Sequence, residues 1–215
     1  MRTQRNVVPA LLTDKKENLS RMLDICSGFC NYAQIDIMDG KLVPSKSISV
    51  KDLSGMRFPI RSEAHLMVED PLEWIEAFKN AGSTRVIFHF EIKEKNHLKI
   101  IDAIRKQNLE VGIAVNPSTK IKDFEFLINR VNCVLFMSVI PGFYGSKFIP
   151  EVLDKIKEFK TLYPEKCAGI DGGVKTENVK TVAESGVNYV CVGSAILKAE
   201  NPKEAFLKIK GLLNG

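Results

Sequence analysis

Residues 110–139 read EVGIAVNPSTKIKDFEFLINRVNCVLFMSV, an apolar run followed by a helical pattern and a second apolar run. The runs Glu110–Val115 and Cys133–Val139 are continuously apolar rather than alternating, which is typical of strands buried on both faces. Between them, Ile121–Asn129 has apolar residues at helical spacing. The segment therefore predicts a strand, a helix and a second strand of a sheet that helices cover.

The same alternation continues in both directions along the chain. The other predicted strands are Val7–Leu12, Ala33–Met38, Ile60–Met67, Arg85–Phe88, Cys167–Ile170 and Tyr189–Val192. The other predicted helices are Lys16–Cys26, Pro71–Asn80, Asn96–Gln107, Ile149–Thr161, Thr176–Ser185 and Pro202–Leu213, and the connection Val43–Gly55 has only a weak helical pattern.

Eight strand–helix alternations in 215 residues predict one α/β domain over residues 1–215, a (β/α)₈ TIM barrel. The competing architecture is an open doubly wound sheet, which usually has a glycine-rich turn after its first strand. Here Leu12-Thr13-Asp14-Lys15 follows the first strand instead, which favours the barrel.

Composition excludes several classes of protein. No apolar run approaches the 18 residues of a membrane span, and the first apolar run, Val7–Leu12, is too short for a signal-peptide core. The net charge of +5 is spread evenly, which gives little support to nucleic-acid binding but favours small anionic substrates. The five scattered cysteines are expected to be reduced. We expect a soluble cytoplasmic protein without a membrane or nucleic-acid partner.

Polar side chains at predicted strand ends are candidates for chemistry, because these barrels hold their active sites there. Gln34, Asp36 and Met38 alternate onto one face of their strand, and a carboxylate in such an apolar strand is costly unless it is paired or bound to metal. His65 and Asp171 end two other strands. Two carboxylates and one imidazole predict a divalent-metal site. A buried hydrogen-bond network without metal is the alternative.

Other polar residues carry weaker signals. A lone strand-end histidine such as His89 is more often structural than a ligand, and His97 is expected on the surface of its helix. Asp39-Gly40 is interpreted as a turn pair. Asp70 is the expected N-cap of the helix that begins with Pro71.

Glycine-rich segments follow the sixth, seventh and eighth predicted strands. They are Pro141-Gly142-Phe143-Tyr144-Gly145-Ser146-Lys147, Asp171-Gly172-Gly173-Val174 and Val192-Gly193-Ser194-Ala195. Backbone amides of such loops bind phosphate, and phosphate sites in these barrels frequently follow strands seven and eight. The sequence thus predicts a site for a phosphorylated ligand, with the segment after strand six as a lid.

In order and spacing, these motifs resemble the ribulose-phosphate 3-epimerase family from about Val7 to Leu213. The resemblance is carried by Pro9-Ala10-Leu11-Leu12-Thr13, Asp36-Ile37-Met38-Asp39-Gly40, Val43-Pro44, His65-Leu66-Met67-Val68, Phe88-His89-Phe90-Glu91, Met137-Ser138-Val139-Ile140-Pro141-Gly142-Phe143, Lys147-Phe148, Asp171-Gly172-Gly173-Val174 and Gly193-Ser194-Ala195-Ile196.

The resemblance implies interconversion of D-ribulose 5-phosphate and D-xylulose 5-phosphate, or of a longer ketose phosphate such as allulose 6-phosphate. Asp36 and Asp171 match the acid and base, and His65 with the same aspartates matches three of four ligands of one divalent metal (Zn, Fe, Mn or Co). A homo-oligomer is also implied. Residues matching substrate contacts are Thr13, His65, the capping methionines Met38, Met67 and Met137, and the phosphate-loop residues Gly142, Phe143, Tyr144, Gly145, Gly172, Gly173, Gly193 and Ser194.

The sequence departs from the family pattern near the carbonyl end of the substrate. The family's first metal-binding histidine is Gln34 here, whose carbonyl is a weaker and harder ligand than imidazole, so metal affinity should fall and selectivity should shift towards oxygen-preferring ions. Gln34 could also hydrogen-bond the substrate. The further departures are Thr13 for serine, Lys41 for histidine, Ser45 for asparagine, Ile140 for asparagine and Tyr144 for glycine.

Two other functions stay open at this stage. A hexulose-phosphate synthase or decarboxylase of the same barrel group would carry an Asp-x-Lys-x-x-Asp motif, and Asp36-Ile37-Met38-Asp39 lacks the lysine. A non-catalytic sugar-phosphate-binding homologue is the third possibility, because fold does not guarantee function.

Overall fold

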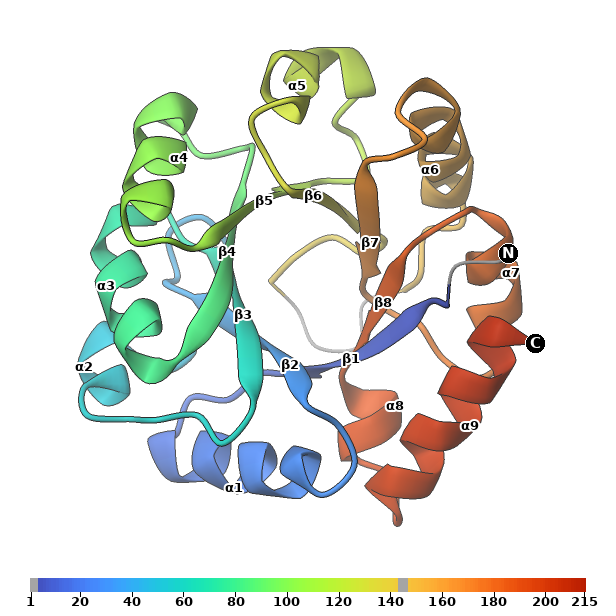
Figure 1. Ribbon diagram of the computed structural model, residues 1–215, viewed down its shortest axis with the longest axis horizontal. Coiled ribbons are helices and arrows are strands. Elements are labelled where there is room, and N and C mark those ends of the chain that lie inside the picture. The colour runs from blue at the N-terminus through green and yellow to red at the C-terminus, as the bar shows by residue number, and fades with distance from the viewer. Residues whose placement is uncertain (1–3, 143–146) are drawn as a thin grey trace.

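Eight parallel strands close into a barrel in the order of the chain, in a computed structural model that describes residues 4–142 and 147–215. Strand β1 pairs with β8 as well as with β2, which closes the sheet (Figure 1). The strands are β1 (Asn6–Leu11), β2 (Tyr32–Met38), β3 (Arg61–Met67), β4 (Ser83–His89), β5 (Glu110–Val115), β6 (Cys133–Met137), β7 (Cys167–Asp171) and β8 (Tyr189–Val192).

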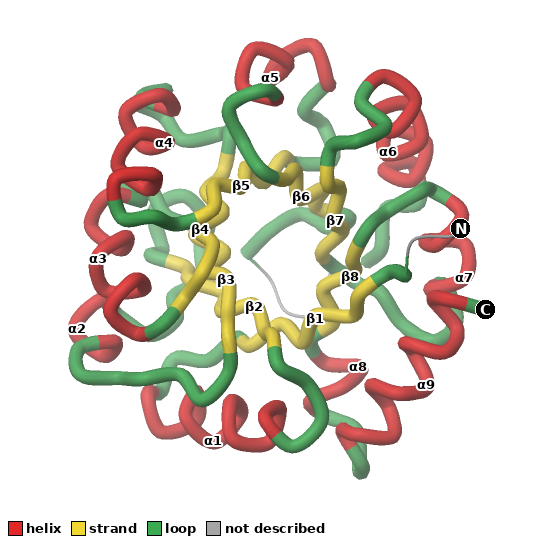
Figure 2. Tube along the Cα trace, in the orientation of Figure 1, coloured by secondary structure: helices red, strands yellow, loops and turns green. Residues whose placement is uncertain are grey.

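Helices form a ring around the barrel (Figures 1 and 2). The first and last described segments lie side by side, because Asn214 Oδ1 accepts a hydrogen bond from the Arg5 amide at 2.8 Å. The helices are α1 (Lys16–Ser27), α2 (Val50–Leu53), α3 (Leu72–Ala81), α4 (His97–Lys106), α5 (Ile121–Ile128), α6 (Glu151–Leu162), α7 (Val179–Glu184), α8 (Ser194–Leu197) and α9 (Pro202–Asn214). The predicted α/β class and (β/α)₈ barrel are confirmed.

The hydrophobic core has two layers, which explains why the strand sequences are continuously apolar. On β4, Val86 and Phe88 pack in the layer between sheet and helices, whereas Ile87 packs inside the barrel. On β2, Ile35 and Ile37 belong to the outer layer. The residues that alternate with them therefore point into the barrel, as the sequence predicts for the polar positions of this strand.

Three local predictions were wrong. His97 is buried rather than on the surface, because its ring stacks on Phe90 at 5.0 Å and its Nε2 bonds the Phe90 carbonyl at 2.8 Å. The N-cap of α3 is Pro71, although Asp70 Oδ1 still accepts a hydrogen bond from the Leu72 amide at 3.0 Å. Helix α8 was not predicted, because the sequence interprets Gly193-Ser194-Ala195 as loop.

Other local predictions are confirmed. Only the short α2 forms in the weak connection after β2, stabilised by a capping box between Ser49 and Asp52. Asp39-Gly40 is a turn, in which Asp39 Oδ1 accepts from the Lys41 amide at 2.8 Å and Gly40 has a φ of 76°. All five cysteines are free.

Within residues 4–142 and 147–215, each helix falls short of the length and apolar character that a membrane span requires.

Gly169 on β7 is required by the interior packing, because a Cβ atom there would overlap the ring of Tyr189. We expect Gly169→Ala to lower the free energy of unfolding by about 1–3 kcal/mol, the usual result of overpacking. Urea unfolding measures this. Gly211→Ala in α9 is the matched control, since a Cβ there meets nothing within 4 Å and should stabilise the helix by about 0.5–1 kcal/mol. Equal stability of Gly169→Ala and the native protein would contradict the packing.

Candidate active site

A cavity of about 670 Å³ opens at the carboxyl-terminal ends of the strands. The pairing of β2 with β3 places Asp36 directly beside His65 in register, and Asp171 is the last residue of β7. The barrel is narrow enough for these three side chains to meet in its mouth. Their ligand atoms lie within 4.8 Å of one another, and all three residues are buried.

His65 lies between the two carboxylates. Its Nδ1 is 2.9 Å from Asp36 Oδ1 and 3.3 Å from Asp171 Oδ2. Burial by itself lowers the pKa of His65, but hydrogen bonds with Asp171 and Asp36 outweigh it and raise that pKa to about 10. The imidazole is therefore a cation at neutral pH when its neighbours are the two carboxylates alone.

The two aspartates are coupled to each other through their charges. Burial and the charge of Asp171 raise the pKa of Asp36 to about 6, although hydrogen bonds with His65 and Gln34 act in the opposite direction. A carboxyl with a pKa near neutrality exchanges protons readily in both directions, which is the property that an acid/base catalyst needs.

Gln34 completes the floor of this cluster and is fully buried. Its Nε2 donates to Asp36 Oδ1 at 2.8 Å and to Asp171 Oδ2 at 2.7 Å, and it lies 3.4 Å from His65 Nδ1. Its Oε1 accepts a hydrogen bond from the Cys191 thiol at 3.0 Å. The sequence signalled Gln34 through its strand face, but gave no sign that Cys191 would contact it.

Two further side chains, His89 and Glu91, orient His65 through its Nε2 atom. Its Nε2 lies 3.0 Å from Nε2 of His89, and His89 Nδ1 lies 3.3 Å from Glu91 Oε2. Because burial lowers the pKa of His89 and keeps it neutral, its Nε2 accepts from His65 while its Nδ1 donates to Glu91. His89 and Glu91 therefore fix the ring of His65. Sequence reasoning undervalued His89; the signal was a strand-end histidine with a glutamate two residues later.

Three of the four side chains in this cluster, Asp36, His65 and Asp171, offer ligand atoms that suit a divalent ion. Ligand atoms of an ion with bonds of about 2.1 Å lie about 3.0–3.4 Å apart, and the distances of 2.9 and 3.3 Å from His65 Nδ1 to Asp36 and Asp171 are close to this range. Gln34 Nε2 stands at a fourth vertex, where its carbonyl oxygen would be the ligand. The residues present thus fit a metal once the side-chain amide of Gln34 has rotated so that its oxygen and nitrogen exchange places.

The rim of the cavity contains most of the other residues that the sequence singled out. Its lining includes Thr13, the three predicted methionines and most of the predicted phosphate-loop residues. The methionines are Met38, Met67 and Met137, and the phosphate-loop residues are Gly142, Gly172, Gly173, Gly193 and Ser194. Phe143, Tyr144 and Gly145 lie outside the described residues. Among the residues described, the departures Lys41, Ser45 and Ile140 lie outside this lining.

Contacts between loops hold the rim together. Gly142, at a φ of 101°, packs against Val43 and Pro44, and its carbonyl accepts a hydrogen bond from Ser45 Oγ at 2.5 Å. The connection after β2 therefore contacts the segment after β6 across the mouth. A larger cavity, of about 750 Å³, opens at the opposite end of the barrel and includes Tyr32 and Arg85, but not the aspartate pair.

Comparison with known proteins agrees with this geometry. The model of the ribulose-phosphate 3-epimerase family matches residues 6–197. The chain is 34% identical to ribulose-phosphate 3-epimerase of Bacillus subtilis over 214 residues, covering 95% of this chain and 98% of that protein. It is 32% identical to the Schizosaccharomyces pombe enzyme of the same name over 220 residues, covering 98% and 93%.

Solved structures of other barrels share the fold at low sequence identity. The 3-hexulose-6-phosphate synthase of Salmonella typhimurium superposes with a TM-score of 0.73 at 17% identity, covering 97% of this chain and 98% of that one. KGPDC from Streptococcus mutans, solved in complex with D-R5P, gives a TM-score of 0.73 at 13% identity, covering 98% and 97%. Because the family model matches residues 6–197 of this chain, the chain belongs to the ribulose-phosphate 3-epimerase family.

Proposed function

We propose that the protein is an isomerase that interconverts D-ribulose 5-phosphate and D-xylulose 5-phosphate, with Asp36 and Asp171 as the acid/base pair. The observation that carries the proposal is the meeting of these two buried carboxylates, from β2 and β7, in one cavity at the carboxyl ends of the strands. Membership of the epimerase family supports the reaction class.

Inversion at C3 needs a base on one face of the substrate and an acid on the other, because the proton leaves from one side and returns to the opposite side. One ionised aspartate accepts the C3 proton, and the other aspartate, protonated, donates to the opposite face of the planar enediolate. Asp36 and Asp171 come from strands separated by β8 and β1, so their carboxylates approach a ligand in the mouth from different sides.

The other residues bind and shield the substrate in this proposal. Met38, Met67 and Met137 give the cavity an apolar lining that keeps water from the enediolate. The loops at Gly172–Gly173 and Gly193–Ser194 present backbone amides for the phosphate group. His65 is held beside the two aspartates by the contact between its Nε2 and His89.

One divalent ion is part of the proposal, held by Asp36, His65 and Asp171, with the Gln34 carbonyl as a weaker fourth ligand. When bound, it supplies a Lewis acid for the C2 carbonyl oxygen of the substrate. Because an amide carbonyl is a hard oxygen ligand, we expect this site to favour oxygen-preferring ions such as Mn²⁺ more strongly than a site with histidine in place of Gln34 would.

The test is an assay of the purified protein with D-ribulose 5-phosphate and, in separate reactions, Mn²⁺, Fe²⁺, Co²⁺, Zn²⁺ or chelator. We expect formation of xylulose 5-phosphate, highest with an added ion. Ribulose 5-phosphate with formaldehyde and allulose 6-phosphate are run in parallel. Binding of phosphosugars without conversion of any would contradict the proposal and favour a sugar-phosphate-binding protein.

A further inference from the structure

The two ends of the Gln34 side-chain amide face different partners. The nitrogen end faces Asp36 Oδ1 and Asp171 Oδ2, at 2.8 and 2.7 Å, and the oxygen end faces the Cys191 thiol, at 3.0 Å. Ionised carboxylates only accept hydrogen bonds, so without a metal ion the donor end of the amide faces them. The reverse orientation would place a carbonyl oxygen against two carboxylates, leaving two buried N–H groups without these acceptors.

A divalent ion requires the opposite orientation. The amide nitrogen has no free lone pair for a metal, and it donates to the two aspartate oxygens that would bind the ion, whereas a carbonyl oxygen is an established ligand. Ion binding and the present orientation of Gln34 therefore exclude each other.

We propose that Gln34 is a two-position amide switch: its nitrogen bridges Asp36 and Asp171 in the metal-free site, and its carbonyl turns inward when a divalent ion binds. The inference rests on the metal site of the proposed function, but not on turnover. It also makes the metal-free site an ordered state, with the bridging amide in the place of an ion.

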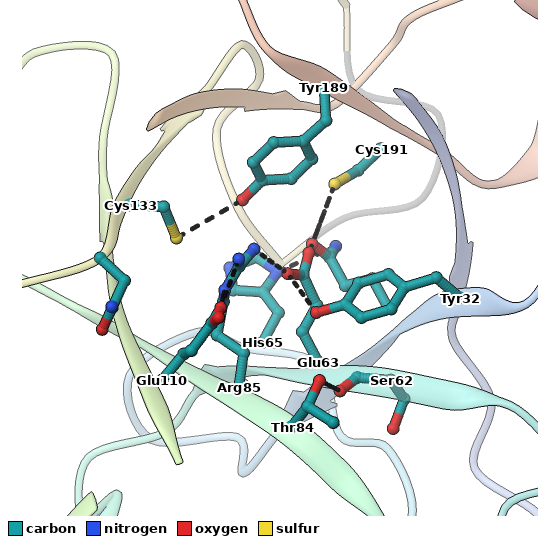
Figure 3. A network of polar contacts seen from close by, with 12 residues as sticks. Tyr32, Ser62, Glu63, His65, Thr84, Arg85, Glu110, Cys133, Tyr189 and Cys191 are labelled. Carbon is teal, nitrogen blue, oxygen red and sulfur yellow. Dashed lines mark hydrogen bonds and ion pairs between the residues drawn. The ribbon is translucent and has the colours of Figure 1, made fainter. Parts of the chain in front are cut away.

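Cys191 is the residue that permits both positions. A thiol is a weak donor and a weak acceptor, so its sulfur can accept from the Gln34 nitrogen once the amide has turned. Its proton then has another acceptor, because Glu63 Oε1 lies 4.0 Å from Cys191 Sγ. Figure 3 shows Cys191 beside this buried network of Glu63 and Arg85. An aliphatic residue at position 191 could neither donate a hydrogen bond to the Gln34 oxygen nor accept one from the Gln34 nitrogen.

The chain offers a direct test, because it contains only three glutamines, Gln4, Gln34 and Gln107. Protein labelled with ¹⁵N in glutamine side chains gives three pairs of amide proton signals by NMR. Gln4→Asn and Gln107→Asn, both outside the cavity, assign Gln34 by elimination without touching the site. Metal-free protein is then titrated with Mg²⁺ or Zn²⁺, which are diamagnetic.

We expect the Gln34 protons to lie at low field and exchange slowly in the metal-free protein, as for donors to carboxylates. At saturation both should shift to higher field, while Gln4 and Gln107 stay unchanged. Gln34 signals that do not move at saturation, or the absence of binding of either ion at millimolar concentration, would overturn the switch. An epimerase assay on the same samples separates the two proposals, since signals that turn in a protein without turnover would contradict only the proposed reaction.

Discussion

Replacing Asp171 with asparagine is expected to lower kcat for epimerisation by about 10²- to 10⁴-fold, the range typical for loss of a general acid or base. Asparagine has the same shape but neither accepts nor donates the transferred proton. Since inversion at C3 uses both faces of the substrate, the remaining Asp36 cannot complete the reaction. The rate of xylulose 5-phosphate formation at saturating substrate measures the effect.

Three further variants distinguish chemistry from folding. Asp36→Asn should fall within the same range, and the double variant should be little slower than either single one, because in the proposed mechanism both residues serve one proton-transfer sequence. Ser194→Ala, at the phosphate loop, should instead raise KM with a smaller change in kcat. Circular dichroism and thermal unfolding establish that each variant is folded. Asp171→Asn retaining more than a tenth of the native kcat would remove Asp171 from the mechanism.

Replacing Arg85 with methionine is expected to lower the free energy of unfolding by about 3–5 kcal/mol. Arg85 Nη1 is 2.9 Å from Oε2 of Glu63, which is fully buried inside the barrel, and Arg85 also binds Glu110 near the surface (Figure 3). Burial raises the pKa of Glu63, and the guanidinium of Arg85 opposes that rise. Removal of Arg85 leaves a buried carboxylate that keeps two weaker contacts, with the Tyr32 hydroxyl at 3.3 Å and the Cys191 thiol at 4.0 Å.

Urea unfolding of three variants tests this expectation. Lys157→Met is the control, because its pair with Asp154 is exposed and such pairs contribute less than about 1 kcal/mol. The double variant Glu63→Leu with Arg85→Met removes both charges and should recover most of the lost stability. A loss for Arg85→Met as small as that for Lys157→Met would show that the Glu63–Arg85 pair does not stabilise the barrel.

Much of the fold can be predicted from periodicity, because strands buried on both faces are continuously apolar and the intervening helices are amphipathic. The boundaries of β5 and β8 agree with the prediction to the residue. The errors have local physical causes. His97 is a polar residue in a helix, and its burial becomes favourable through aromatic side chains of other segments, above all Phe90.

The sequence by itself determined the barrel, the strands that carry Asp36, His65 and Asp171, and the glycine loops, because each depends on alternation and spacing along one segment. The tertiary structure alone decided which polar groups meet. Gln34 and Cys191 are 157 positions apart, and His65 contacts His89 through the pairing of separate strands. Closure of the sheet brings these side chains within hydrogen-bond distance, and no local pattern encodes the orientation of an amide between two carboxylates.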